Sequence, residues 1–456
     1  MGMDTQGVRW TADQVLALAP DDASRRAGSK LGTAGPWSGT GGSGEGAVWG
    51  LCRGSGSKPY RTVVDITGPA YSCSCPSRKF PCKHALGLLL LWASDGADVG
   101  GGDAPDWAEQ WLEGRRKRAE GVRAREADGS GRAGTADPEA ARRRAERRAA
   151  RITAGAEELE QRLADLLRGG LASAEQSGYG LWEETAARMV DAQAPGLAGR
   201  VRELGSIPGS GPGWPVRLLE ECALTHLLDR AWLSVDRLPG PLAATVRTRV
   251  GLPAPVQGTA VRDRWLVLAQ YDSTDGKLTT RRIWLHGRET GRTALLLSFG
   301  AMGRAPELGL PVGVTVDAAL TPHAGAGALR AELGELFSAP APLDAPPRGG
   351  TVGDALHAYG LALREDPWLD SWPVTLADVV PIPTDHGWQL ADASPVAGGG
   401  EALPLSGPAL GRPGLWRLAA LSGGGPVTVF GECGHRGFTP LAAWSADAPG
   451  ETVPLH

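Results

Sequence analysis

Four side chains of the kinds that bind zinc lie within twelve residues of the chain: Cys73, Cys75, Cys82 and His84. Three thiolates and one imidazole form a tetrahedral ligand set for Zn²⁺. Because protein would fill all four positions, no position remains for a reactive water, which is typical of structural zinc sites. The cluster therefore predicts one structural zinc ion, whose binding can contribute roughly 10 kcal/mol or more to folding.

The spacing of the first two cysteines restricts the backbone around them. In a regular strand Cys73 and Cys75 would point to opposite faces, so the chain must turn between them. Pro76 follows at once and favours such a turn. Upstream, Val48–Cys52 and Tyr60–Ile66 are typical of two strands joined by a glycine-containing hairpin loop.

The second pair of ligands coincides with the start of a helix. Pro81 suits a first helical position, because its missing N–H has no partner there in any case. We expect a helix from about 82 to 94, with Cys82 at its edge and His84 in its first turn. The helix is apolar on nearly all sides, which predicts that it is buried.

Three basic residues surround the cluster: Arg78, Lys79 and Lys83. Three thiolates and one Zn²⁺ leave a net charge of −1, which these side chains can offset. We also expect them to contact a partner protein or a nucleic acid.

The pattern Cys-x-Cys, a spacer, then Cys-x-His resembles the SWIM zinc finger over about residues 45–95. The resemblance implies a ββα shape, the same four residues as zinc ligands, and a module that binds DNA or protein without catalysis of its own. The run Tyr71–Trp92 is also similar to bacterial SWIM-family proteins of this size.

Composition limits the class of protein. The net charge of −4 excludes a chain that is a polycation as a whole. Met1–Trp10 shows no secretory signal, and the longest apolar run, Leu86–Ala93, is far shorter than the ~20 residues that cross a membrane. We therefore expect a cytoplasmic protein with reduced thiols.

Residues 115–151 differ sharply from the rest of the chain. They hold thirteen Lys or Arg and six Asp or Glu, a local charge of +7, and no aromatic residue. The block is interpreted either as a phosphate-binding segment or as a solvated linker and helix. Without aromatic residues it offers no stacking platform for single-stranded nucleic acid.

The remaining pattern predicts an α+β protein with a small zinc-stabilised ββα N-terminal module, a helical middle and a β-rich antiparallel C-terminal region. The expected domains are a SWIM-type zinc finger domain, an Arg-rich linker or solvated helix, a helical region and a β-rich α+β domain, at 1–112, 113–150, 151–260 and 261–456. The strongest strand patterns are Trp265–Tyr271, Leu278–Leu285 and Thr293–Phe299, with short candidates at Trp388–Ala391, Trp416–Ala420 and Val427–Phe430. The glycine- and serine-rich Gly39–Gly46 is expected to be a loop.

A second metal site is an open alternative. Cys222 and His226 share one face of an expected helix, and Cys433 and His435 repeat the Cys-x-His spacing. Buried free cysteines are the commoner outcome for such residues. Cys52 is likewise expected in the core.

Trp368 and Trp372, close to two aspartates, could line a recognition groove. Trp residues are more often core anchors in a β-rich domain that has few other aromatic residues. We therefore expect both to be core residues.

These patterns favour a zinc-binding adaptor whose partner is a protein or a nucleic acid. No phosphate-binding loop, nucleophile elbow or His-Glu-x-x-His helix occurs in the chain, so no catalytic residue is predicted. Two alternatives remain open: an enzyme with an unrecognised active site in 171–456, and a structural subunit of a larger complex.

Overall fold

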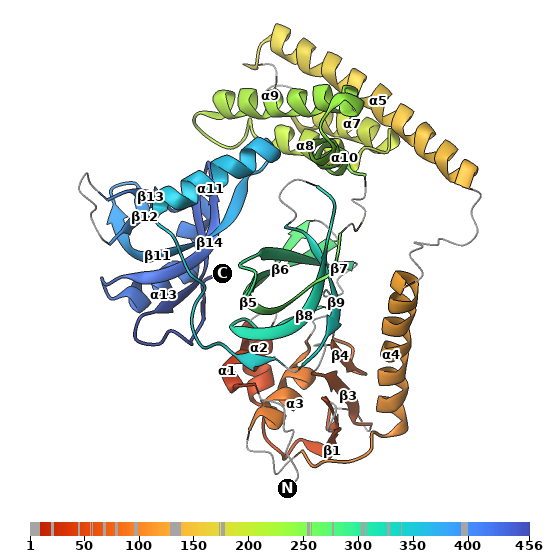
Figure 1. Cartoon of the computed structure of the whole chain (residues 1–456), viewed down its shortest axis with the longest axis vertical. Helices are drawn as coiled ribbons and strands as arrows, with labels where there is room; N and C mark the ends of the chain where they lie inside the picture. Colours follow the sequence, from red (N-terminus) through yellow and green to blue (C-terminus); the bar gives the residue numbers. More distant parts are fainter. Residues whose placement is uncertain are drawn as a thin grey trace.

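The computed structural model shows antiparallel sheets and a helical bundle arranged along the long axis of the molecule (Figure 1). The N-terminal module lies at one end, the helical bundle at the other, and two six-stranded sheets lie between them. This arrangement confirms the α+β prediction. The structure describes residues 10–19, 22–43, 46–54, 56, 58–66, 70–77, 81–94, 99–127, 138–172, 174, 178–252, 256, 258–275, 278–301, 306, 308–325, 329–338, 340–393 and 400–456.

The N-terminal module is a four-stranded antiparallel sheet in the order β1-β2-β3-β4. Helix α3, the longest helix of the module, packs on β2, β3 and β4 and carries eight buried residues. The core around it also takes Trp10, Val15 and Leu18 from the first helix and its lead-in. The elements are α1 (Ala12–Ala17), α2 (Asp22–Ser29), β1 (Trp37–Gly42), β2 (Ala47–Cys52), β3 (Tyr60–Asp65), β4 (Ala70–Cys73) and α3 (Lys83–Ala93).

Strand β1 corrects the prediction that Gly39–Gly46 is a loop. The strand reaches Gly42, pairs with β2, and has a bulge between Ser38 and Gly41. A Cβ on Gly41 would lie 2.8 Å from the ring nitrogen of Trp49, so only glycine lets the two strands pair here. Gly41, one of the small residues that indicated a loop, is thus required by its large neighbour Trp49.

The helical middle begins with two long helices. Helix α4 (Asp106–Ala127) lies against the N-terminal sheet, where Ala108 is buried with Trp49 and Val63. Helix α5 (Pro138–Gly169) leads into the bundle. The expected boundaries at 112 and 150 therefore fall inside helices.

The bundle packs α5 against shorter helices around one apolar core. Each helix buries one face against this core and exposes the opposite face to solvent, as amphipathic helices do. The helical middle expected from the sequence is therefore present, and it includes the helix expected to carry Cys222 and His226. The shorter elements are α7 (Gly178–Asp191), α8 (Pro195–Ser206), α9 (Trp214–Leu233), the 3₁₀ turn η1 (Val235–Arg237) and α10 (Gly240–Val250).

The first six-stranded sheet has the order β10-β8-β5-β6-β7, with β9 paired to β8. Three consecutive strands of this sheet, at the β7 end of the order, contain the three strongest strand patterns of the sequence, and each is longer than expected. The strands are β5 (Val261–Asp275), β6 (Leu278–Gly287), β7 (Thr293–Ala301), β8 (Val314–Pro322), β9 (Ala331–Leu336) and β10 (Ala341–Pro342).

The second six-stranded sheet has the order β13-β12-β11-β14-β15-β16 and packs on the first through a shared core that contains Trp284, Phe430 and Trp444. Helices α11 and α13 contact strands of this second sheet. The elements are α11 (Val352–Glu365), β11 (Ser371–Thr384), β12 (Gly387–Asp392), β13 (Ala402–Pro404), α12 (Gly407–Leu410), α13 (Pro413–Ser422), β14 (Val427–Gly434), β15 (Gly437–Ser445) and β16 (Val453–Pro454).

One strand prediction in this region is wrong. Trp416–Ala420 lies in helix α13, not in a strand. The helix starts at Pro413 and stops at Gly423, whose φ of 53° is the left-handed conformation that ends helices. A short apolar run does not distinguish helix from strand by itself, and these two end signals decide it.

Trp368 anchors the C-terminal region to the bundle. Its side chain is 3% exposed and lies in the bundle core, and its ring nitrogen donates to the carbonyl of Leu224 over 2.9 Å. Trp372 packs partly buried on the core of the second sheet. Trp368 is therefore a core residue, as expected, whereas Trp372 packs against a core without being fully buried.

Replacing Trp368 should weaken the attachment of the bundle. We expect Trp368→Ala to lower the free energy of unfolding by about 3–5 kcal/mol, since it leaves a large cavity. The matched control is Trp416→Ala, which removes a ring that is 67% exposed and should change stability by less than about 0.5 kcal/mol. Urea unfolding of both variants measures the difference, and equal losses would contradict the anchor role.

Candidate metal centre

The first two cysteines are placed by the end of a strand. Strand β4 stops at Cys73, and Cys75 lies in the bend that follows. The Ser74 amide still donates to the carbonyl of Arg61 on β3 over 3.0 Å, which holds the bend against the sheet. The turn expected between the two cysteines is therefore present, and it lets both thiols face one point.

The other two residues are placed by the start of a helix. Cys82 is the N-cap of α3, with extended backbone angles and no capping hydrogen bond from its side chain. His84 follows in the first turn and is 4% exposed. A cap residue whose sulfur is not used for capping can turn that sulfur to a metal.

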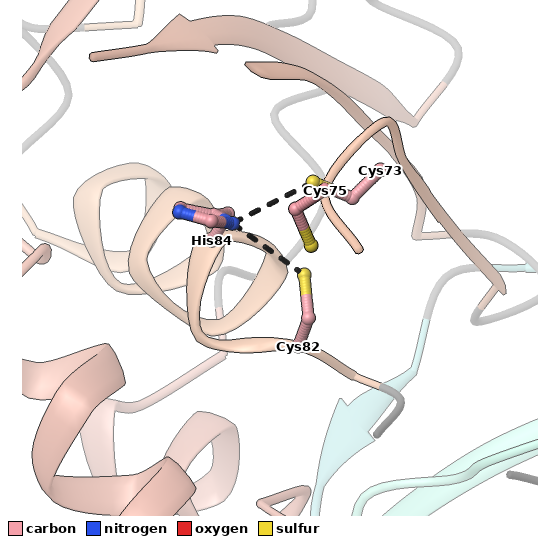
Figure 2. A group of neighbouring side chains, drawn as sticks. All are labelled: Cys73, Cys75, Cys82 and His84. Carbon is pink, nitrogen blue, oxygen red and sulfur yellow. Dashed lines mark hydrogen bonds between the residues drawn. The ribbon is translucent and has the colours of Figure 1, made fainter. Parts of the chain in front are cut away.

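The four side chains converge on one point (Figure 2). Their ligand atoms all lie within 4.8 Å of one another. The Nδ1 atom of His84 lies 3.7 Å from the sulfur of Cys73 and 4.0 Å from that of Cys82. Ligands of a tetrahedral zinc ion, at about 2.3 Å for sulfur and 2.0 Å for nitrogen, are about 3.6 Å apart. Cys73, Cys75, Cys82 and His84 are thus positioned to bind one zinc ion.

Crowding of the thiols shifts their pKa values in opposite directions. Hydrogen bonds from Cys73 and Cys82 hold the pKa of the Cys75 thiol below its usual value. Hydrogen bonds to Cys73 and Cys75, together with burial, raise the pKa of Cys82. Burial lowers the pKa of His84, but the neighbouring thiols outweigh it and raise the pKa to about 9. The sulfurs compete for shared protons, and a divalent cation can take the place of those protons.

Two residues of β3 support the ligands. The hydroxyl of Thr62, itself fully buried, lies 3.3 Å from the sulfur of Cys73 and can donate to a thiolate. The ring of Tyr60 packs on that of His84 with centroids 4.8 Å apart. Both contacts orient the ligand they touch, as groups just outside a metal's ligands do.

Of the three basic residues expected to contact a partner, only one lies in the part of the chain that the structure describes. Lys83 is exposed beside the ligands, and its charge acts on the buried Cys52. Arg78 and Lys79 lie outside the described residues. Cys52 is a core residue of β2, as expected.

The candidates for a second metal site are not brought together. Cys222 and Cys433 are buried, His226 is exposed and bonded to Glu160, and His435 lies 3.3 Å from the hydroxyl of Tyr359. Across the described part of the chain, the four-residue cluster is the one group arranged to hold a metal ion.

Comparison with protein families agrees with this geometry. The model of the SWIM zinc finger matches residues 63–93, which hold all four ligands. The chain contains a SWIM zinc finger. The model of the SWIM-associated four-helix bundle domain matches residues 147–250, which run from α5 to α10. Neither a curated protein nor a solved structure matches the chain.

Within the described residues, no helix combines the length and the apolar character that crossing a membrane requires. The most apolar long segment, α3, is instead the buried helix of the SWIM module.

A cavity of about 570 Å³ adjoins the metal centre. The residues that line it come from α2 and the turn after it, from the β2–β3 connection and the first residue of β3, from the bend after β4 and from the start of α3. They are Ala23, Ser24, Ala27, Leu31, Arg53, Gly54, Tyr60, Cys75, Pro76, Ser77, Lys83 and His84. Sequence reasoning missed this cavity, because α2 meets the finger only in three dimensions and no local pattern marks the contact.

Proposed function

We propose that the protein is a cytoplasmic adaptor whose SWIM module binds a protein partner in the cavity beside the zinc site. The cavity is the observation that carries this proposal. SWIM zinc fingers are interaction modules, and here two ligands, Cys75 and His84, form part of the cavity wall. Zinc would therefore shape the binding surface as well as stabilise the module.

The lining of the cavity favours a protein segment with acidic and apolar side chains. Arg53 and Lys83 are exposed at the cavity, while Leu31 and Tyr60 supply apolar surface. Concave sites of this size with a few polar groups bind compact groups such as side chains. A nucleic-acid duplex is too broad to enter such a cavity, which is why a protein partner is favoured.

The test compares full-length variants that reverse charge inside and outside the cavity. Arg53→Glu/Lys83→Glu should lose the partner, and Lys58→Glu, an exposed lysine of the same module that does not line the cavity, should keep it. Co-purification followed by mass spectrometry should identify a protein that binds wild type and the Lys58→Glu control but not the cavity variant. Titration with that purified protein then measures its affinity for each of the three. An identical set of partners for both variants would contradict the proposal.

A further inference from the structure

The N-terminal half of α5 carries three exposed arginines on one side: Arg144, Arg147 and Arg151. With about 100° of rotation per helical residue, the three side chains fall within about 60° of one another. They extend roughly 10 Å along the helix axis. These three residues are called the arginine stripe below.

Acidic side chains in this half of α5 lie away from the arginine stripe. Glu139 accepts from Arg143 over 2.9 Å, and Glu146 accepts from Arg142 over 2.8 Å. Glu139, Arg142 and Glu146 lie on the other side of the helix, and Arg143 lies at the edge of the arginine stripe, about 40° from Arg147, where it pairs with Glu139. Among the described residues, none of the ion pairs involves an arginine of the stripe.

The next acid on the side of the arginine stripe is also engaged. Glu158 lies two turns further along α5 and pairs with Arg162 and with Arg188 of α7. The stripe therefore faces solvent without a carboxylate of α5 to neutralise it.

The arginine stripe also lies where a large ligand can reach it. Buried residues of α5 begin at Ile152, so tight packing against the bundle starts there. Before that point, Arg148 ties the helix to the bundle through the carbonyl of Gly251. Figure 1 shows the N-terminal end of α5 extending beyond the other bundle helices. An extended surface of this kind suits a long partner better than a small molecule.

We propose that the arginine stripe binds the phosphate backbone of a nucleic-acid duplex without reading its sequence. Guanidinium groups match phosphate geometry, and a duplex presents closely spaced charges along its length. The absence of aromatic residues from 115–151 removes the stacking that single strands require, which favours a duplex. This site is separate from the cavity of the SWIM module and does not depend on it.

The test uses two double variants of the full-length protein that remove the same charge. Arg144→Gln/Arg151→Gln removes two arginines of the stripe, and Arg142→Gln/Arg143→Gln removes two ion-paired arginines of the same helix. Binding to a short duplex of arbitrary sequence, DNA in one arm and RNA in the other, is measured over a range of salt concentrations. Glutamine keeps the helix propensity close to that of arginine.

Wild type should bind at least one duplex with a slope of log K against log salt of about −2.7, as expected for three phosphate contacts. The stripe variant should reduce the magnitude of this slope by about two, and the control should leave it nearly unchanged. Equal effects of both variants, no duplex binding by wild type, or tighter binding to single strands or to anionic lipid vesicles would overturn the proposal. The Arg53→Glu/Lys83→Glu variant should retain duplex binding, which keeps the two proposals distinguishable.

Discussion

Removing zinc should unfold the SWIM module while the helical bundle stays folded. The cysteine ligands belong to the same core cluster as α3: Cys82 is buried in it, and Cys73 and Cys75 pack against it. Loss of the metal leaves crowded thiols and a buried imidazole without their common partner. Sites of this kind contribute roughly 10 kcal/mol or more, which is as large as the whole stability of a typical small domain.

Hydrogen exchange of the full-length protein, with and without a strong chelator, measures this effect. Amides of α3 should lose protection and those of α9 should keep it. Cys82→Ser should have the same effect without chelator, although serine is a good N-cap and would favour the start of the helix. Cys222→Ala, which removes a buried thiol from the bundle, should leave α3 protected. Unchanged exchange of α3 in Cys82→Ser would contradict a structural metal.

Raising the pH should destabilise the bundle through one buried carboxyl group. Asp229 on α9 is fully buried, and neither of its carboxyl oxygens has a hydrogen-bond partner in the described part of the structure. Burial, and then the charge of Glu160, raise the pKa of Asp229 from 3.8 to about 8. The folded protein therefore keeps a proton that the unfolded chain releases near pH 4.

The direction of the pH effect follows from this difference. Stability from Asp229 is fully present below pH 3.8 and is lost as the pH rises through about 8. Between these values the free energy of unfolding should fall by up to about 1.4 kcal/mol per pH unit, on the order of 5 kcal/mol in all.

Asp229→Asn should remove most of this dependence, because asparagine does not ionise. Exchange of α9 amides between pH 5 and 9, corrected for intrinsic exchange rates, measures the stability of the bundle at each pH. The variant should be more stable than wild type by on the order of 5 kcal/mol at pH 9 but by only about 1.7 kcal/mol at pH 5. Asp236→Asn is the control, since that carboxylate is 92% exposed. Parallel pH profiles for wild type and Asp229→Asn would show that Asp229 is not the group responsible.

The metal ligands could be predicted from the sequence because the site is local. Its four residues span twelve positions, and zinc restricts both their chemistry and the turns between them. The helix after Cys82 was predictable for the same reason, since the apolar run indicates its burial; Pro81, expected at the first helical position, instead precedes the N-cap residue Cys82. Its observed bounds, Lys83–Ala93, agree closely with the expected 82–94.

Features that depend on distant residues could not be predicted. Strand β1 forms because β2 offers a hydrogen-bonding edge and Trp49 requires glycine opposite it, and neither fact is local to Gly39–Gly46. The cavity beside the metal centre needs α2, some fifty residues before Cys75, to pack against the finger. In the sequence, the arginine stripe shows only as part of an excess of positive charge. The structure distinguishes its arginines from Arg142 and Arg143, which form ion pairs with Glu146 and Glu139.

Metal analysis of the purified full-length protein, combined with X-ray absorption at the zinc edge, shows whether the four ligands hold a structural zinc ion. We expect one zinc per chain, with three sulfur ligands at about 2.3 Å and one nitrogen ligand at about 2.0 Å. A folded chain without zinc, or a zinc shell with fewer than three sulfur ligands, would contradict a Cys₃His site.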